Sequence, residues 1–250
     1  MADGTTGTYR EAEAEFTVEP DMTITPTSGS IGDTVSVSGT GFGKRKSITI
    51  TYDGDEPPLV VTVTADSSGA FQYTLIVPPS RYGAHNITVT DGTNTKPLTF
   101  TMESTPPSPV YPQLPLMDSK LEAWRFDWCG DATDLTKEVT DDSLPVTYTL
   151  QIASDASFSV IVLEKEGLTT SEYTLTEAEE KLVSASSEKA PYYWRVKAID
   201  AASNETAWTG TGTFYVGFAW PDWIIYLWFG LGILAAGVLG FWLGRRTTYY

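Results

Sequence analysis

The stretch Thr34-Val35-Ser36-Val37-Ser38 alternates apolar and polar side chains with a period of two. Successive side chains of a β-strand point to opposite faces of the sheet, so the two valines face one way and the hydroxyl side chains face the other. One buried face and one wet face is the pattern of an antiparallel sheet that packs on one side. The stretch therefore predicts a half-buried strand.

The same alternation recurs on both sides of this strand, between turn sequences rich in Gly, Pro, Asp and Ser. The apolar positions are Ile48/Ile50/Tyr52, Phe71/Tyr73/Leu75/Val77 and Leu98/Phe100/Met102. Breaks at 53–55, 66–69 and 78–80 supply the turns. Residues 21–103 are therefore predicted to form an all-β sandwich of about seven strands.

A second strand-rich block, residues 113–217, follows a proline-rich linker at 104–112. Proline fixes the backbone φ angle, which makes such a linker short and semi-rigid. Residues 177–182 are expected to form one helical turn between strands. The predicted inward positions are Phe126/Trp128, Tyr148/Leu150/Ile152, Tyr173/Leu175, Tyr192/Trp194/Val196/Ala198 and Phe214/Val216.

Residues 1–20 contain a partial repeat of the end of the first sandwich. The D-G-T turn at 3–5 and the F-T-V-E strand at 16–19 match D-G-T at 91–93 and F-T-M-E at 100–103. Because the second copy closes a sandwich, we expect residues 1–20 to be the final strand of a preceding immunoglobulin-like repeat or an N-terminal extension. Residues 1–20 have no apolar core, so we expect no cleavable signal peptide within them.

The pattern Pro26-x-x-Gly29-x-x-Gly32-x-x-Val35-x-Val37-x-Gly39-x-Gly41-Phe42 resembles the TIG/IPT group of immunoglobulin-like domains. Such domains occur in receptors, transcription factors and prokaryotic surface proteins, so the resemblance implies a fold rather than a partner.

The second block resembles a fibronectin type III domain. Phe126-Asp127-Trp128 is similar to the tryptophan motif of that family's second strand, and residues 192–198 are similar to the late strand that carries its tyrosine, here Tyr192. The sequence of residues 147–155 is similar to that of fibronectin type III domains in prokaryotic surface proteins. The predicted architecture is two tandem immunoglobulin-like β-sandwiches followed by a single transmembrane α-helix.

That helix is predicted at residues 223–244, which contain no charged residue and 11 Leu, Ile, Val or Phe. As a helix the segment spans about 33 Å, close to a hydrocarbon core of about 30 Å. The aromatic residues Trp223, Trp228 and Trp242 fit the membrane interfaces. Arg245 and Arg246 follow, so the positive-inside rule puts the tail, 245–250, in the cytoplasm and the β-domains outside. Residues 218–222 are juxtamembrane.

Small residues recur every four positions along this segment, at Gly232, Ala236, Gly240 and Gly244. Such a stripe lets another helix approach closely, although glycine is also common in membrane helices without a partner. The segment ending in paired arginines also resembles prokaryotic C-terminal sorting signals. No LPxTG or Pro-Glu-Pro motif precedes it, which favours a retained anchor.

The net charge of −16 argues against a nucleic-acid partner, since phosphate binding requires clustered Lys and Arg. The single histidine, His85, shares a strand face with Ile87, and the single cysteine, Cys129, ends a predicted strand, so both are interpreted as structural. We predict no catalytic residue, no cofactor and no metal site. The acidic groups at Asp53/Asp55/Glu56 and Asp131/Asp134/Asp141/Asp142 lack the spacing of known calcium loops, and acidic turns are ordinarily just solvated.

Two N-x-T sequons, at Asn86 and Asn204, are candidate glycosylation sites. Asn86 is expected to face solvent because it alternates with Ile87.

The favoured function is a non-enzymatic, single-pass surface protein for adhesion or as a stalk, with membrane lipid and a protein partner or a second copy as contacts. One alternative is an accessory subunit of a membrane complex. Another is a carbohydrate-binding surface module, with a glycan as partner.

Overall fold

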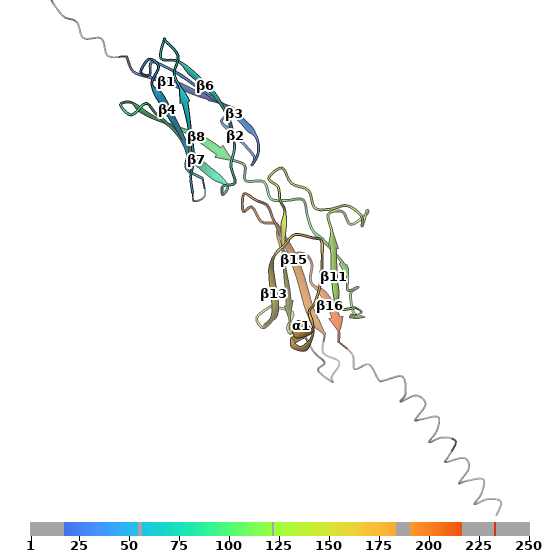
Figure 1. Cartoon of the computed structure of the whole chain (residues 1–250). Helices are drawn as coiled ribbons and strands as arrows, with labels where there is room; N and C mark the ends of the chain where they lie inside the picture. The colour runs from blue at the N-terminus through green and yellow to red at the C-terminus, as the bar shows by residue number, and fades with distance from the viewer. Residues whose placement is uncertain (1–17, 55–56, 122, 184–190, 217–232, 234–250) are drawn as a thin grey trace, which may run out of the picture.

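The computed structural model describes residues 18–54, 57–121, 123–183, 191–216 and 233. These residues form two successive β-units, each with two sheets and its own hydrophobic core (Figure 1). The all-β prediction is confirmed.

In the first unit, the smaller sheet contains three antiparallel strands in the order β1-β3-β6. These strands are β1 (Asp21–Thr25), β3 (Thr34–Thr40) and β6 (Phe71–Ile76). The larger sheet has the order β2-β8-β7-β4-β5, and only its β2–β8 pair is parallel. Its strands are β2 (Ser28–Gly29), β8 (Thr95–Met102), β7 (Gly83–Thr90), β4 (Ser47–Tyr52) and β5 (Leu59–Thr64).

The core of the first unit is built from the alternating apolar positions of these strands. The burial of Val35 and Val37, between more exposed hydroxyl side chains, confirms the period-two prediction. The opposite sheet contributes mainly aliphatic and β-branched side chains, which pack well on a pleated surface. The fully buried side chains include Ile48, Ile50, Tyr52, Ile87, Val89, Phe100 and Met102.

The second unit repeats this arrangement. Its smaller sheet has the order β14-β11-β9, from β9 (Tyr111–Leu114), β11 (Arg125–Cys129) and β14 (Glu172–Thr174). Its larger sheet has the order β10-β16-β15-β12-β13. The strands are β10 (Ser119–Lys120), β16 (Gly212–Tyr215), β15 (Tyr192–Ile199), β12 (Thr147–Ala153) and β13 (Ile161–Leu168). In chain order within each unit, the smaller sheet joins strands one, three and six, and the larger sheet runs two, eight, seven, four, five.

Aromatic side chains dominate the core of the second unit. Phe126 makes edge-to-face contacts with Trp194, at 5.3 Å between ring centroids, and with Phe214, at 5.4 Å. Trp128 packs in the same way on Tyr148. Large rings bury much apolar area, which suits a sandwich whose one cysteine is free.

The predicted helical turn is confirmed as α1 (Glu177–Leu182). It begins with a capping box, in which the Thr176 hydroxyl accepts from the Glu179 amide and the Glu179 carboxylate accepts from the Thr176 amide. Glu179 also pairs with Lys165 of β13, which ties the helix to the larger sheet.

No helix among the described residues is long and apolar enough to cross a membrane. The predicted anchor, 223–244, lies outside the described residues except for Ile233, and so does the tail, 245–250. The residues predicted for anchoring and helix packing therefore all lie outside the described part of the chain. They are Trp223, Trp228, Trp242, Arg245, Arg246, Gly232, Ala236, Gly240 and Gly244.

Candidate functional site at the domain junction

The two units meet where the connection between β15 and β16, residues 200–211, reaches the first unit (Figure 1). Ala202 in this connection has no exposed surface and belongs to the hydrophobic core cluster of the first unit. Its carbonyl accepts a hydrogen bond of 2.8 Å from the Tyr82 amide, just before β7. Ala202 of the second unit is thus buried in the core of the first unit and accepts a backbone hydrogen bond from it.

Glu103, directly after β8, receives side-chain hydrogen bonds from two parts of the second unit. The Ser143 hydroxyl donates to Glu103 Oε1 at 2.7 Å. Asn204 Nδ2 donates to the same oxygen at 3.1 Å. Both donors are buried, so these bonds are shielded from competing water. The contact between the two units, here called the joint, therefore consists of these specific contacts as well as the linker.

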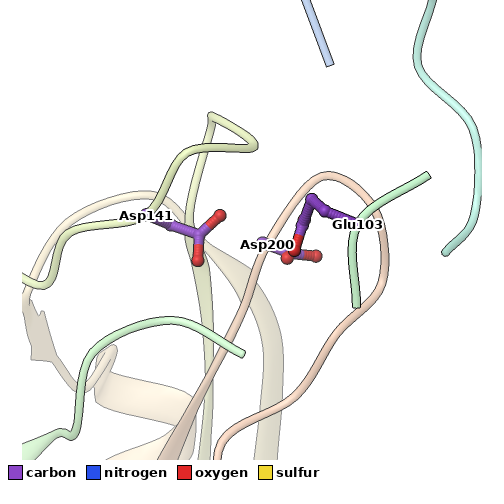
Figure 2. A group of neighbouring side chains, drawn as sticks. All are labelled: Glu103, Asp141 and Asp200. Carbon is purple, nitrogen blue, oxygen red and sulfur yellow. The ribbon is translucent and has the colours of Figure 1, made fainter. Parts of the chain in front are cut away.

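Three carboxylates converge at this joint (Figure 2). Glu103, Asp141 and Asp200 each offer an oxygen, and these oxygens lie within 4.8 Å of one another. Asp141 comes from the connection between β11 and β12, and Asp200 directly follows β15. Asp200 accepts from the Asn204 backbone amide and from Asn204 Nδ2, both at 2.7 Å.

Burial and the closeness of like charges raise the pKa of two of these carboxyl groups. Burial raises the pKa of Asp200 above its usual value, and the Glu103 carboxylate adds to the rise, against the lowering effect of the Asn204 hydrogen bonds. Burial likewise raises the pKa of Asp141, with contributions from Asp200 and Glu103. Carboxylate oxygens are the ligands that hard cations such as Ca²⁺ prefer, so the group has the donor type for such an ion.

Only Asp141 of this group belongs to the acidic loop noted in the sequence. Its neighbours Asp131 and Asp134 instead close their own turns, by accepting from the backbone and hydroxyl of Thr133 and Thr136 respectively. Glu103 and Asp200 each follow a strand as isolated acidic residues, and no spacing in the sequence links them. Their association depends on how the two units meet.

His85 lies at the edge of the first core, as predicted from its alternation with Ile87. Its ring stacks on Tyr52 at 5.2 Å between centroids, and Nε2 donates to the Arg81 carbonyl at 2.6 Å. Nδ1 lies 3.3 Å from Asp53. Asp55 and Glu56, the other members of this predicted acidic group, lie outside the described residues.

The buried thiol of Cys129 lies 3.2 Å from the Asp131 carbonyl, a contact typical of a packed structural cysteine.

The two sequon asparagines occupy different surroundings. Asn86 is exposed, as expected, and its Nδ2 donates to Asp53 at 2.9 Å. Asn204 is only 5% exposed, and its Nδ2 donates hydrogen bonds to Asp200 and Glu103. A glycan on Asn204 would break the joint, so of the two candidates only Asn86 has the accessibility that a glycan needs.

Comparison with known families assigns the first unit: residues 22–102 match the model described as the IPT/TIG domain. This match confirms the TIG/IPT resemblance for that unit and, with the sheet order, its immunoglobulin-like fold. No curated protein matches the chain.

Several solved structures are similar at low identity. Macromomycin is 21% identical over 34% of this chain and 99% of its own, with a TM-score of 0.29. A tetra-tandem repeat in the extending region of a large adhesion protein is 15% identical over 79% of this chain and 49% of its own, with a TM-score of 0.43. The human OSCAR ligand-binding domain is 11% identical over 79% of this chain and 98% of its own, with a TM-score of 0.26.

Proposed function

We propose that this chain is a non-enzymatic surface protein, whose two β-units form a stiff interaction stalk held to a membrane by residues 223–244. The observation that carries the proposal is the joint itself. Ala202 is buried in the first core, and Ser143 and Asn204 both bind Glu103. Such contacts oppose bending between the units, which is what a projecting stalk requires.

An interaction role also agrees with the family of the first unit, because immunoglobulin-like domains commonly mediate protein–protein contacts. The residues best suited to catalysis, His85 and Cys129, are engaged in packing contacts.

The second unit is proposed to be of the fibronectin type III kind. Its sheet order is the same as that of the first unit and so supports an immunoglobulin-like sandwich, while the fibronectin type III assignment rests on the two sequence motifs. Trp128 lies in the core of the smaller sheet, and Tyr192 begins β15, where its ring stacks on Phe214. Both positions agree with the motifs that carry the resemblance.

Anchoring is supported by sequence, and membrane extraction tests it. The full chain is expected to stay in the membrane pellet after alkaline carbonate treatment, and a variant lacking 223–244 is expected to be released. A variant lacking 245–250 serves as the control and should stay in the pellet. Release of the full chain would contradict the anchor.

The orientation is tested by protease added outside intact cells. Digestion of both β-units with protection of a tag at the C-terminus is expected. Protection of the β-units would contradict the proposed extracellular location. Stoichiometric recovery of one other membrane protein in mild detergent would instead favour an accessory subunit.

A further inference from the structure

The connection between β9 and β10 exposes an apolar run in the second unit. Its sequence at 114–117 is L-P-L-M, and the side chains of Leu116 and Met117 are 65% and 69% exposed. A mostly apolar groove of about 470 Å³ lies beside this run, and its apolar members are Leu114, Pro115, Leu116 and Ala123. Single exposed apolar side chains are ordinary, but a contiguous apolar patch indicates a surface that contacts something other than water.

The apolar run lies beside the strand with which the second unit ends. β10 pairs in parallel with β16, and the Asp118 amide donates to the Thr213 carbonyl at 2.9 Å. Val216, the last described residue of the unit, follows Thr213 by three positions. Because a strand rises about 3.3 Å per residue, Met117 lies roughly 10 Å from the point where the chain leaves the unit.

The predicted anchor begins a short way further along the chain. Six residues, 217–222, separate Val216 from the segment 223–244. A chain spans at most about 3.6 Å per residue, so residue 223 lies within about 25 Å of Val216. With residue 223 at the membrane interface, the apolar run is within reach of the bilayer. The tether gives lipid a high effective concentration next to this run, which a partner free in solution does not have.

The neighbouring charged side chains determine what kind of membrane contact is favourable. Asp118, directly after Met117, accepts a hydrogen bond of 2.6 Å from the Thr213 hydroxyl, and its carboxylate would be costly to place in hydrocarbon. Lys120 is exposed and forms no ion pair within the described part of the chain, and its long stem lets the ammonium reach a lipid phosphate. The net charge of −16 disfavours an anionic surface. These charges favour a shallow contact with zwitterionic lipid.

We propose that Leu116 and Met117 form a shallow contact with the bilayer that holds residues 223–244, at the headgroup boundary of a zwitterionic phospholipid. Contacts of this kind bury apolar side chains about 5–10 Å into the boundary between headgroups and acyl chains. The second unit then rests on the membrane by this side, which restricts the directions in which the stalk projects. The proposal rests on the anchor proposed above and adds a second membrane contact to it.

Spin-label accessibility in the full chain, reconstituted in phosphatidylcholine vesicles, tests this contact. A nitroxide at Leu116→Cys is expected to be severalfold more accessible to oxygen, which concentrates in the bilayer, than to a water-soluble nickel chelate. Leu144→Cys is the matched control, because Leu144 is 61% exposed and directly follows Ser143, which binds Glu103 at the joint. Its label should be more accessible to nickel, and the native Cys129 is buried. A Leu116 label as accessible to nickel as the Leu144 label would overturn the proposal, and so would one shielded from both reagents, because protein would then cover the run.

A second readout uses a charge to weaken the contact. Leu116→Asp should reduce the oxygen accessibility of a label at Met117→Cys to that of the Leu144 label, whereas Leu144→Asp should leave the Met117 label unchanged. Equal oxygen accessibility of the Met117 label in both variants would contradict the contact. Flotation of the same vesicles reports the anchor separately. A chain that floats with a water-accessible Leu116 label would contradict the contact and leave the anchor standing, and a chain that does not float would contradict both.

Discussion

Two aspartates occupy the same position in the two β-units and experience opposite environments. Asp91 directly follows β7, and Asp200 directly follows β15. The Asp91 carboxylate accepts backbone hydrogen bonds from Asn94, Gly43 and Thr93. These bonds, that of Asn94 foremost, lower the pKa of Asp91 to about 2 although partial burial opposes them.

Asp200 lies instead at the joint, where burial and Glu103 raise its pKa despite the hydrogen bonds from Asn204. The same turn position thus stabilises a hairpin in one unit and adds electrostatic cost to a domain contact in the other. The comparison teaches that strand order fixes where such a residue lies, while its neighbours decide what it contributes.

The largest expected difference between the units lies in the strands that lead into these turns. Trp194 on β15 and Ile87 on β7 are both fully buried. Trp194→Ala should cost about 3–5 kcal/mol of unfolding free energy, and Ile87→Val about 0.5–1.5 kcal/mol. Urea unfolding followed by circular dichroism measures both. A loss for Trp194→Ala no larger than that for Ile87→Val would contradict the full burial of the indole.

Removing the carboxylate of Asp91 tests its role in the hairpin. Asp91→Ala leaves three backbone amides without their acceptor, so we expect a loss of about 1–3 kcal/mol at pH 7. Asp91→Asn keeps one acceptor oxygen and should lose less. The urea midpoints of the two variants and of the parent measure these losses. An unchanged midpoint for Asp91→Ala would contradict the role of this carboxylate in stabilising the hairpin.

Acidification should remove the stability that the ionised Asp91 carboxylate contributes. Because the pKa of Asp91 is lower in the folded chain than in the unfolded chain, its ionised form contributes stability above about pH 4. That contribution is lost as the pH falls through about 2. The difference in unfolding free energy between the parent and Asp91→Asn should therefore be constant near neutral pH. It should decrease as the pH falls from about 4 to about 2. A difference that widens on acidification would contradict the assigned pKa direction.

The smallest effect is expected at the joint and has the opposite sign. The raised pKa of Asp141 means that its ionised form costs stability at neutral pH, and that cost is relieved as the pH falls through the raised pKa. Asp141→Asn keeps an acceptor for the Ser143 amide and should stabilise the chain by up to about 1 kcal/mol at pH 7. The gain should shrink on mild acidification; destabilisation at pH 7 would show that the charge itself holds the joint.

Much of the fold was predictable from local sequence, because alternation reports burial directly. The period-two positions of β3, β4 and β12 all lie in the cores, and the Thr176 capping box begins α1 where the sequence E-A-E-E-K-L indicated a helical turn. The turns of the first unit follow from Gly, Pro and Asp at defined positions.

The joint could not be predicted in this way. Glu103, Asp141 and Asp200 are far apart in the chain, and each has an ordinary local environment in sequence. Ala202 carries no signal that it would enter another unit's core. Long-range contacts between domains depend on surface shape, which local periodicity does not encode.

The account depends most on a fixed joint, and a distance distribution between spin labels on the two units tests it. Labels at Thr99→Cys and Glu166→Cys lie on exposed positions of β8 and β13, and the native Cys129 is buried. Pulsed electron paramagnetic resonance of the full chain should give one narrow distance distribution. Ala202→Asp should broaden it by placing a charge in the first core, whereas Ala207→Asp, at an exposed site of the same connection, should leave it narrow. A distribution in the parent as broad as that of Ala202→Asp would contradict the stiff stalk.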